Sequence, residues 1–198
     1  LCGLLFYIDG NASKYIIRIT RLCAINIVLA LSMNLVNGFT GIFSLGHAGF
    51  MAIGAYTVAL LTIPVAKKET IFMLEPLVAP LNTLTLPFGA ALIIGGLLAA
   101  ALAFLIGLPC LRLRGDYLAI ATLGFSEIIR IVITNAQSLT NGAQGLKSIP
   151  STANIWWCYG VALATIVFIA LLISSSYGRA FKAIREDEIA AESMGVSL

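Results

Sequence analysis

The sequence predicts an all-α, polytopic transmembrane helix bundle that contains a broken helix and ends in a charged cytoplasmic helix. Three observations predict this fold. Of the 198 residues, 60% are hydrophobic and only 11% are charged, whereas soluble domains carry about 25% charged residues. Apolar runs of membrane length recur along the chain, and a cluster of glycines interrupts one of them. A stretch of mixed charge follows the last run.

Five apolar segments approach the length of a membrane-spanning helix, about 20 residues. They are residues 22–36, 48–65, 86–108, 118 to about 139, and 155–173. The first is short unless Ile16 and Ile17 belong to it. The last opens with aromatic residues that are typical of a membrane interface, namely Trp156, Trp157 and Tyr159. Small residues at four-residue spacing, such as Gly95 and Ala99, predict close packing between helices.

The charges of the connecting loops predict the orientation of the segments. Short loops rich in Arg and Lys favour the cytoplasmic side, which places there the loop that carries Arg112 and Arg114. Alternation then puts the stretch after the fifth segment in the cytoplasm as well, in agreement with its three cations. Two groups of cations fall on the opposite side, against the rule: Lys67 with Lys68, and Lys14 with Arg18 and Arg21.

Residues 36–50, VNGFTGIFSLGHAGF, carry four glycines between two apolar runs: Gly38, Gly41, Gly46 and Gly49. Each glycine weakens a helix by about 1 kcal/mol, so we expect the helix to break here. Non-helical backbone at membrane depth persists only where protein or a water-filled cavity satisfies it, and broken helices line the substrate paths of transporters. The break is therefore either part of a substrate path or a structural bend.

Three polar residues near the break are candidates for a substrate path. Ser44 is expected to cap the helix that follows. His47, the single histidine of the chain, either contacts substrate or a proton, or is satisfied by backbone at the helix start. Asn34 precedes the break and, with Asn26, is expected to form hydrogen bonds between helices.

Glu127 and Arg130 lie three residues apart inside the fourth segment, close enough to pair on one helix face. A charge inside a span costs about 2.5–3.5 kcal/mol and indicates a functional site. The pair is either part of the path or a self-paired structural element that faces the bundle. A hydrolase that uses Ser126 with His47 is a weaker alternative, since Gly124-Phe125-Ser126 is not followed by a second glycine.

Other chemistries find little support in the sequence. The four cysteines have no paired spacing, so we expect no metal site and interpret them as buried small apolar residues: Cys2, Cys23, Cys110 and Cys158. The net charge of +3 forms no basic stripe for nucleic acid. No catalytic residue is predicted.

The stretch 177–198, YGRAFKAIREDEIAAESMGVSL, is expected to be a helical docking surface for a soluble partner. Its cations Arg179, Lys182 and Arg185 precede an acidic triplet, and small residues follow that would let a neighbour approach closely. A solvated surface helix is the alternative. We therefore expect a transmembrane domain over residues 1–176, with an N-terminal stub of an earlier span before five spans. A truncated cytoplasmic segment, ending within a helix at Leu198, is expected over residues 177–198.

Three stretches, residues 34–61, 111–146 and 177–198, resemble the permease subunits of branched-chain amino acid ABC transporters, most closely the LivM type. The resemblance extends over most of residues 21–198. It makes the last stretch similar to a coupling helix that docks into an ATPase cleft. The residues implied in docking are Gly178, Arg179, Ala190, Ala191, Glu192 and Gly195. One departure is Ile189, which stands where the general pattern has Glu, with Glu188 one residue earlier.

The resemblance implies an importer permease of the bacterial inner membrane that works by alternating access and has no ATP site or cofactor of its own. It implies a second permease of the LivH type, two ATP-binding subunits that hold ATP and Mg²⁺, and an external substrate-binding protein. Two alternatives stay open. The cargo is urea, an amide or another small polar solute, or the chain is a stand-alone secondary transporter or channel.

Overall fold

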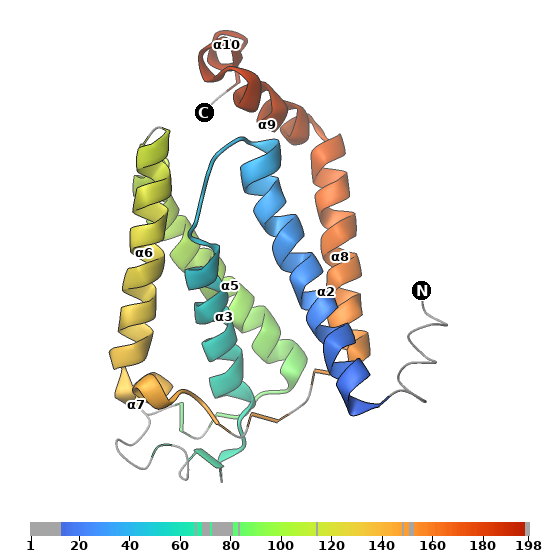
Figure 1. Cartoon of the computed structure of the whole chain (residues 1–198), viewed down its shortest axis with the longest axis vertical. Coiled ribbons are helices and arrows are strands. Elements are labelled where there is room, and N and C mark those ends of the chain that lie inside the picture. Colours follow the sequence, from blue (N-terminus) through green and yellow to red (C-terminus); the bar gives the residue numbers. More distant parts are fainter. Residues whose placement is uncertain are drawn as a thin grey trace. The chain divides into compact units, whose positions relative to one another are not determined.

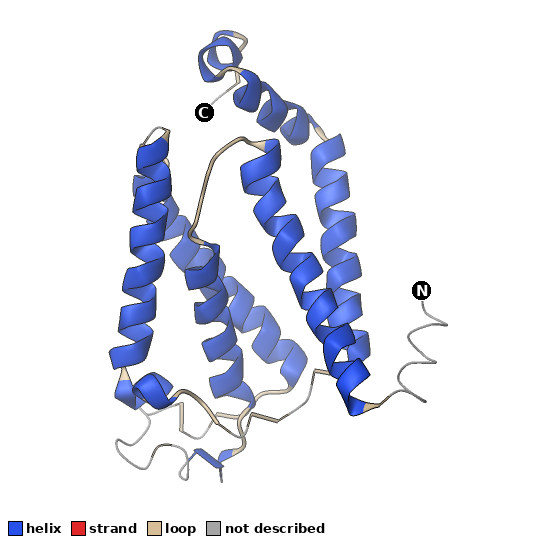
Figure 2. Cartoon of the chain, in the orientation of Figure 1, coloured by secondary structure: helices blue, strands red, loops and turns tan. Residues whose placement is uncertain are grey.

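The computed structural model describes residues 13–65, 67–68, 72, 81–82, 84–113, 115–147, 149–150 and 153–196. Within these ranges every regular element is a helix (Figure 2). The elements are α2 (Lys14–Asn34), η1 (Leu35–Phe39), α3 (His47–Thr62), α5 (Phe88–Cys110), α6 (Asp116–Asn135), α7 (Gln137–Thr140), η2 (Gly142–Gln144), α8 (Ile155–Ser174), α9 (Ser176–Glu186) and α10 (Glu188–Ser193). The predicted all-α fold is confirmed. The expected N-terminal stub with Cys2, the cation Arg114 and the expected helical end at Leu198 lie outside the described residues.

Four helices in the described part of the chain are long and apolar enough to cross a membrane: Lys14–Phe39, Phe88–Cys110, Tyr117–Asn135 and Ile155–Ser174. The second of the five expected spans is shorter than predicted. It is α3, with 16 residues, which at 1.5 Å per residue reaches about 24 Å against the roughly 30 Å of a hydrocarbon core. The fourth expected span ends earlier than predicted, at Asn135, because Ala136 leaves the helical conformation.

The chain forms two compact units that divide between Phe43 and Ser44 and between Thr152 and Ala153. In the first unit, α2 and α8 pack side by side and run in the same direction (Figure 1). The chain turns sharply from α8 into α9, since a Cβ added to Gly178 would lie 2.1 Å from the carbonyl oxygen of Ile173. This corner therefore requires glycine at position 178.

The second unit is built on the contact between α3 and α5, with α6 packed against both. The backbones of α3 and α5 approach closely at Gly95. A Cβ there would lie 2.7 Å from Cγ2 of Val58 and 3.2 Å from the carbonyl oxygen of Gly54. The predicted role of the small residues in helix packing is confirmed at this position, where dispersion contacts replace the hydrophobic effect that lipid does not provide.

The loop between α3 and α5 carries a buried lysine. Lys68 is only 1% exposed, and its Nζ donates hydrogen bonds to the carbonyl oxygens of Leu81 and Leu84, both at 2.7 Å. Beside it, Leu60 and Phe72 form a small buried cluster. Burial lowers the pKa of the Lys68 ammonium from its ordinary value of 10.5, because desolvation disfavours the charged form.

We predict that Gly95→Ala destabilises the protein while Gly96→Ala does not. An alanine at position 95 would overpack the contact with the stiff Val58 side chain, a change that costs about 1–3 kcal/mol. At Gly96 an added Cβ meets nothing within 4 Å, so the higher helix propensity of alanine stabilises by up to about 1 kcal/mol. Melting temperatures in detergent measure both variants, and equal melting temperatures would show that the close approach at Gly95 is unimportant.

We predict that Lys68 makes stability increase with pH. Between its lowered pKa and 10.5 the unfolded chain binds more protons than the folded chain, so the stability of the protein rises with pH in that window. This contribution is complete above pH 10.5 and is lost as the pH falls through the folded pKa. Neutral lysine keeps two N–H groups for its two carbonyl partners. Melting temperatures from pH 7 to 10.5 should rise in the parent protein and in Lys67→Met, whose side chain is exposed, but this rise should be smaller in Lys68→Met. The same slope in all three would refute the assignment.

Candidate functional site

The predicted broken helix is confirmed, and it lies between α2 and α3. The helix continues from α2 into the five-residue π-helix η1, residues 40–46 are not helical, and α3 begins at His47. Carbonyl oxygens at the end of η1, which lack the next helical turn, accept hydrogen bonds from nearby residues. The hydroxyl of Thr40 donates to the carbonyl oxygens of Val36 and Leu35, and the amide of Ile42 donates to Val36 at 3.3 Å. Gly41 has φ +71°, a conformation that glycine adopts without cost.

Before the break, Asn34 is the last residue of α2, and its side chain lies against Gly38 of η1. A Cβ on Gly38 would lie 2.2 Å from Oδ1 of Asn34, so the glycine leaves room for this amide. Asn26 donates from Nδ2 to the carbonyl oxygen of Leu22 at 2.9 Å. The expectation that Asn26 bonds to another helix is therefore wrong, because a carbonyl four residues earlier lies within reach.

The second half of the break is fixed to α6. The amide of Leu45 donates to Oγ1 of Thr122 at 3.1 Å, and a Cβ on the buried Gly49 would lie 3.1 Å from Cα of Ser126. The sequence did not reveal Thr122, because a threonine in an apolar helix ordinarily bonds within its own helix. Thr122 does so too, donating to the carbonyl oxygen of Ala119 at 3.0 Å.

Two predicted site residues, Ser44 and His47, lie at this start of α3. The expected cap by Ser44 is wrong, because the residue before the helix is Gly46 and no side chain caps it. The hydroxyl oxygen of Ser44 instead accepts a long hydrogen bond of 3.5 Å from the amide of Gly46. His47 is the first residue of α3 and is half-buried.

Glu127 and Arg130 form the predicted ion pair on α6. Nη2 of Arg130 lies 2.6 Å from Oε1 of Glu127, and Nε lies 3.1 Å and 3.0 Å from the two carboxylate oxygens. The pair does not face the interior of this chain, since the side chains of Arg130 and Glu127 are 72% and 51% exposed. On the same helix Thr122 and Ser126 meet the start of α3, at the amide of Leu45 and at Gly49. Charges near the middle of a span must face protein or water, not lipid.

The hydrolase alternative finds no support in the geometry at Ser126. Its hydroxyl donates to the carbonyl oxygen of Leu123 at 2.8 Å, whereas a nucleophilic serine has to donate to a base. Among the described residues no group of His, Cys, Asp and Glu could hold a metal ion. Of the cysteines in that part of the chain, Cys110 is buried and Cys158 half-buried, but Cys23 is exposed, contrary to expectation.

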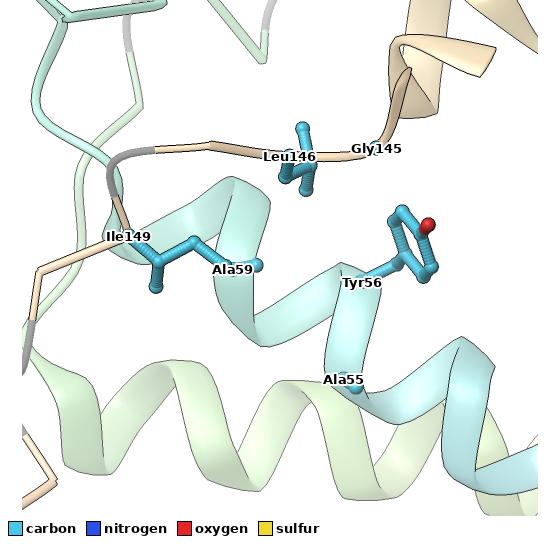
Figure 3. A pocket seen from close by; sticks show the side chains of 6 residues that line it. All are labelled: Ala55, Tyr56, Ala59, Gly145, Leu146 and Ile149. Atoms are coloured by element: carbon cyan, nitrogen blue, oxygen red, sulfur yellow. The ribbon is translucent and has the colours of Figure 1, made fainter. Parts of the chain in front are cut away.

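A cavity of about 250 Å³ lies between α3 and the segment that follows η2 (Figure 3). Its lining is apolar apart from the phenol of Tyr56 and consists of Ala55, Tyr56, Ala59, Gly145, Leu146 and Ile149. Tyr56 is nine residues along α3 from His47, about 14 Å at the rise of a helix. The cavity is therefore separate from the break, and no sequence motif indicated it.

The stretch after α8 is two short helices instead of the single helix expected. Asp187 is extended, with φ −161°, and its carboxylate accepts hydrogen bonds from the amides of Ile189 and Ala190 at 2.9 Å and 3.0 Å. It therefore ends α9 and caps α10. Gly195, at φ +85°, closes α10. Its amide donates to Glu192, and the amide of Val196 donates to Ala191, the pattern of a Schellman motif.

The structure gives different roles to the six residues predicted to dock an ATPase. Arg179, Ala190, Glu192 and Gly195 are exposed, but Gly178 and Ala191 are buried. Gly178 makes the corner between α8 and α9, and Gly195 makes the helix end. Three large side chains in the same stretch are exposed although they were not among the residues predicted to dock, namely Tyr177 at 71%, Ile189 at 73% and Met194 at 85% exposure.

Comparison with known proteins identifies the family. Residues 15–198 match the model of the family described as branched-chain amino acid transport system / permease component. The chain belongs to this family. Family membership and the four apolar helices fit a multi-pass protein of the bacterial inner membrane, and the family is a component of a transport system, not an enzyme. The predicted resemblance is confirmed.

The individual proteins that this chain resembles are named as permease proteins of branched-chain amino acid transport. The chain is 37% identical over 219 residues to the high-affinity branched-chain amino acid transport system permease protein LivM of Escherichia coli (strain K12), covering 93% of this chain and 47% of the relative. The figures are the same for LivM of Salmonella typhimurium. A probable LivM of Methanocaldococcus jannaschii is 24% identical over 85% of this chain and 56% of its own length. The chain spans about half the length of these relatives, and no solved structure matches it significantly.

Proposed function

We propose that the chain is the membrane-spanning permease part of an ATP-binding-cassette importer for branched-chain amino acids. It moves its cargo by alternating access, and ATP hydrolysis takes place on separate subunits. The match of residues 15–198 to the permease family and the names of the LivM relatives support this function. The partners are a second permease of the LivH type, two ATP-binding subunits and an external substrate-binding protein.

The observation that carries the proposal is the surface of α9 and α10. These helices follow the span α8, yet Tyr177, Ile189 and Met194 expose large apolar surfaces there. Large apolar side chains that stand exposed outside a membrane-spanning helix favour a protein interaction site, and aromatic residues and methionine are enriched in interfaces. Asp187 and Gly195 fix both ends of α10, so the surface is held in a defined shape. We assign it to the ATP-binding subunit.

The docking proposal predicts that Ile189→Glu combined with Met194→Glu releases the ATP-binding subunit. Two carboxylates in an apolar contact are desolvated without a partner and weaken binding strongly. Ser193→Ala is the matched control, since its exposed hydroxyl only bonds within α10. Co-purification from the native membrane measures the loss. A chain that purifies alone and still moves solute in liposomes would contradict the proposal and favour a secondary transporter or channel.

We also propose that the Glu127–Arg130 pair and the break, with Asn34, Ser44 and His47, contribute to the substrate path. The ion pair supports this role because it lies exposed on a membrane-spanning helix, where charges face protein or water. A zwitterionic amino acid offers a carboxylate and an ammonium, which are complementary to the two charges of the pair.

The path proposal predicts that Glu127→Gln lowers uptake of leucine by roughly tenfold or more without loss of the assembled complex. The substitution keeps the size of the side chain but leaves Arg130 without its counter-charge. Asn135→Ala, at the end of the same helix, should transport normally. Normal uptake by Glu127→Gln would remove the pair from the path. Competition of leucine uptake by urea or amides would point to the alternative cargo.

A further inference from the structure

The cytoplasmic helix α9 and the broken segment, far apart in sequence, meet at Arg185. Nη1 of Arg185 donates a hydrogen bond to the carbonyl oxygen of Gly38 at 3.1 Å, across 147 residues of chain. The stem of the arginine also lies directly over Gly41. A Cβ added to Gly41 would come within 2.6 Å of Cγ and 3.4 Å of Cβ of Arg185. Both partners belong to the same compact unit.

The hydrogen bond satisfies a group that the break leaves open. A helix that ends leaves its last carbonyls without intrahelical partners. At the end of η1 the hydroxyl of Thr40 donates to the carbonyl oxygens of Val36 and Leu35, and the guanidinium of Arg185 donates to that of Gly38. A cation at the C-terminal end of a helix is favourable both as a donor and toward the helix dipole. Arg185 therefore caps the first half of the broken helix from another element.

Arg185 is held in a position from which it can carry a movement. It lies in the last turn of α9, and its Nη2 donates to Oε1 of Glu186 at 2.8 Å, which fixes the orientation of the guanidinium. Directly after it, Asp187 begins α10. A displacement of the docking surface on α9 and α10 therefore moves the arginine together with its helix.

The chain connects this contact to a second one. Gly41 lies two residues before Phe43, after which the second compact unit begins. In that unit the amide of Leu45 is bonded to Thr122 on α6. Only a few residues of non-helical backbone thus separate Gly41, which contacts the stem of Arg185, from Leu45, whose amide is bonded to Thr122.

We propose that Arg185 is a positioning residue that transmits movement of the ATPase-docking segment to the broken helix, through its contacts with the carbonyl of Gly38 and with Gly41. The inference rests on the proposed function. It assigns to one side chain the step that links ATP hydrolysis to the opening of the path.

The test uses the complete transporter, reconstituted with its ATP-binding subunits, and compares Arg185→Gln with Lys182→Gln. Both variants remove one positive charge from α9, but Lys182 is exposed and no contact of its side chain with the break is seen. ATP hydrolysis and leucine uptake are measured together. We expect Arg185→Gln to keep its ATPase rate and lose tenfold or more of its uptake, whereas Lys182→Gln keeps the ratio of the parent protein. Arg185→Lys, which retains a positively charged donor, should recover part of the uptake.

A second measurement distinguishes transmission from a purely structural role. Amide hydrogen exchange over residues 35–43 should change when ATP is added to the parent complex and to Lys182→Gln, but not to Arg185→Gln. A parent-like ratio of uptake to hydrolysis in Arg185→Gln would overturn the inference, and so would an ATP response in residues 177–186 of the parent complex without one in residues 35–43. The second criterion applies even if Arg185→Gln fails to assemble. If the parent complex shows no ATP-driven uptake, the proposed function itself is wrong.

Discussion

The backbone that the break frees between α2 and α3 must have its polar groups satisfied, and much of the remaining structure depends on this requirement. An unpaired backbone group away from water costs as much as a lost hydrogen bond, and more in lipid. Within the break Thr40 and Ile42 donate hydrogen bonds, Arg185 of α9 adds a third donor, and Thr122 of α6 provides an acceptor. The interruption is therefore tied to α9 on one side and to α6 on the other.

The sequence predicted the existence of the break but not its partners. Glycines at positions 38, 41, 46 and 49 disfavour helix locally, and this effect can be read without a structure. Two of the partners are distant in sequence, Thr122 by 77 positions from Leu45 and Arg185 by 147 from Gly38, and tertiary packing decides their choice. Ser44 failed as a cap because a capping side chain has to stand immediately before the first helical residue, and that residue is His47. The length of α3 was overestimated at its C-terminal end, because Ile63, Pro64 and Val65 continue the apolar run although the backbone leaves the helix at Ile63.

The candidate site shows the same division between local and tertiary information. The pairing of Glu127 with Arg130 follows from their spacing on one helix, so the sequence predicted it. Their exposure depends on which face of α6 meets α3, and the hydropathy of the segment does not encode this. Gly195 was predicted to dock because it is a small residue. Its positive φ in a Schellman motif is by itself a sufficient reason for glycine at this position. Lys68 counted against the expected orientation as an outer cation, yet it is buried on two carbonyls and is not a free surface charge.

The strength of the Arg185 contact limits how firmly it can link hydrolysis to transport. A hydrogen bond to a charged group contributes about 1.5–3 kcal/mol, and the Arg185 side chain is 47% exposed, so water competes and the lower end applies. A contact shifts an equilibrium between two conformations only by the difference in its energy between them. About 1.4 kcal/mol corresponds to a factor of ten. One arginine can thus bias the broken helix by roughly one order of magnitude, and the covalent path from Gly41 to Leu45 carries whatever coupling remains without it.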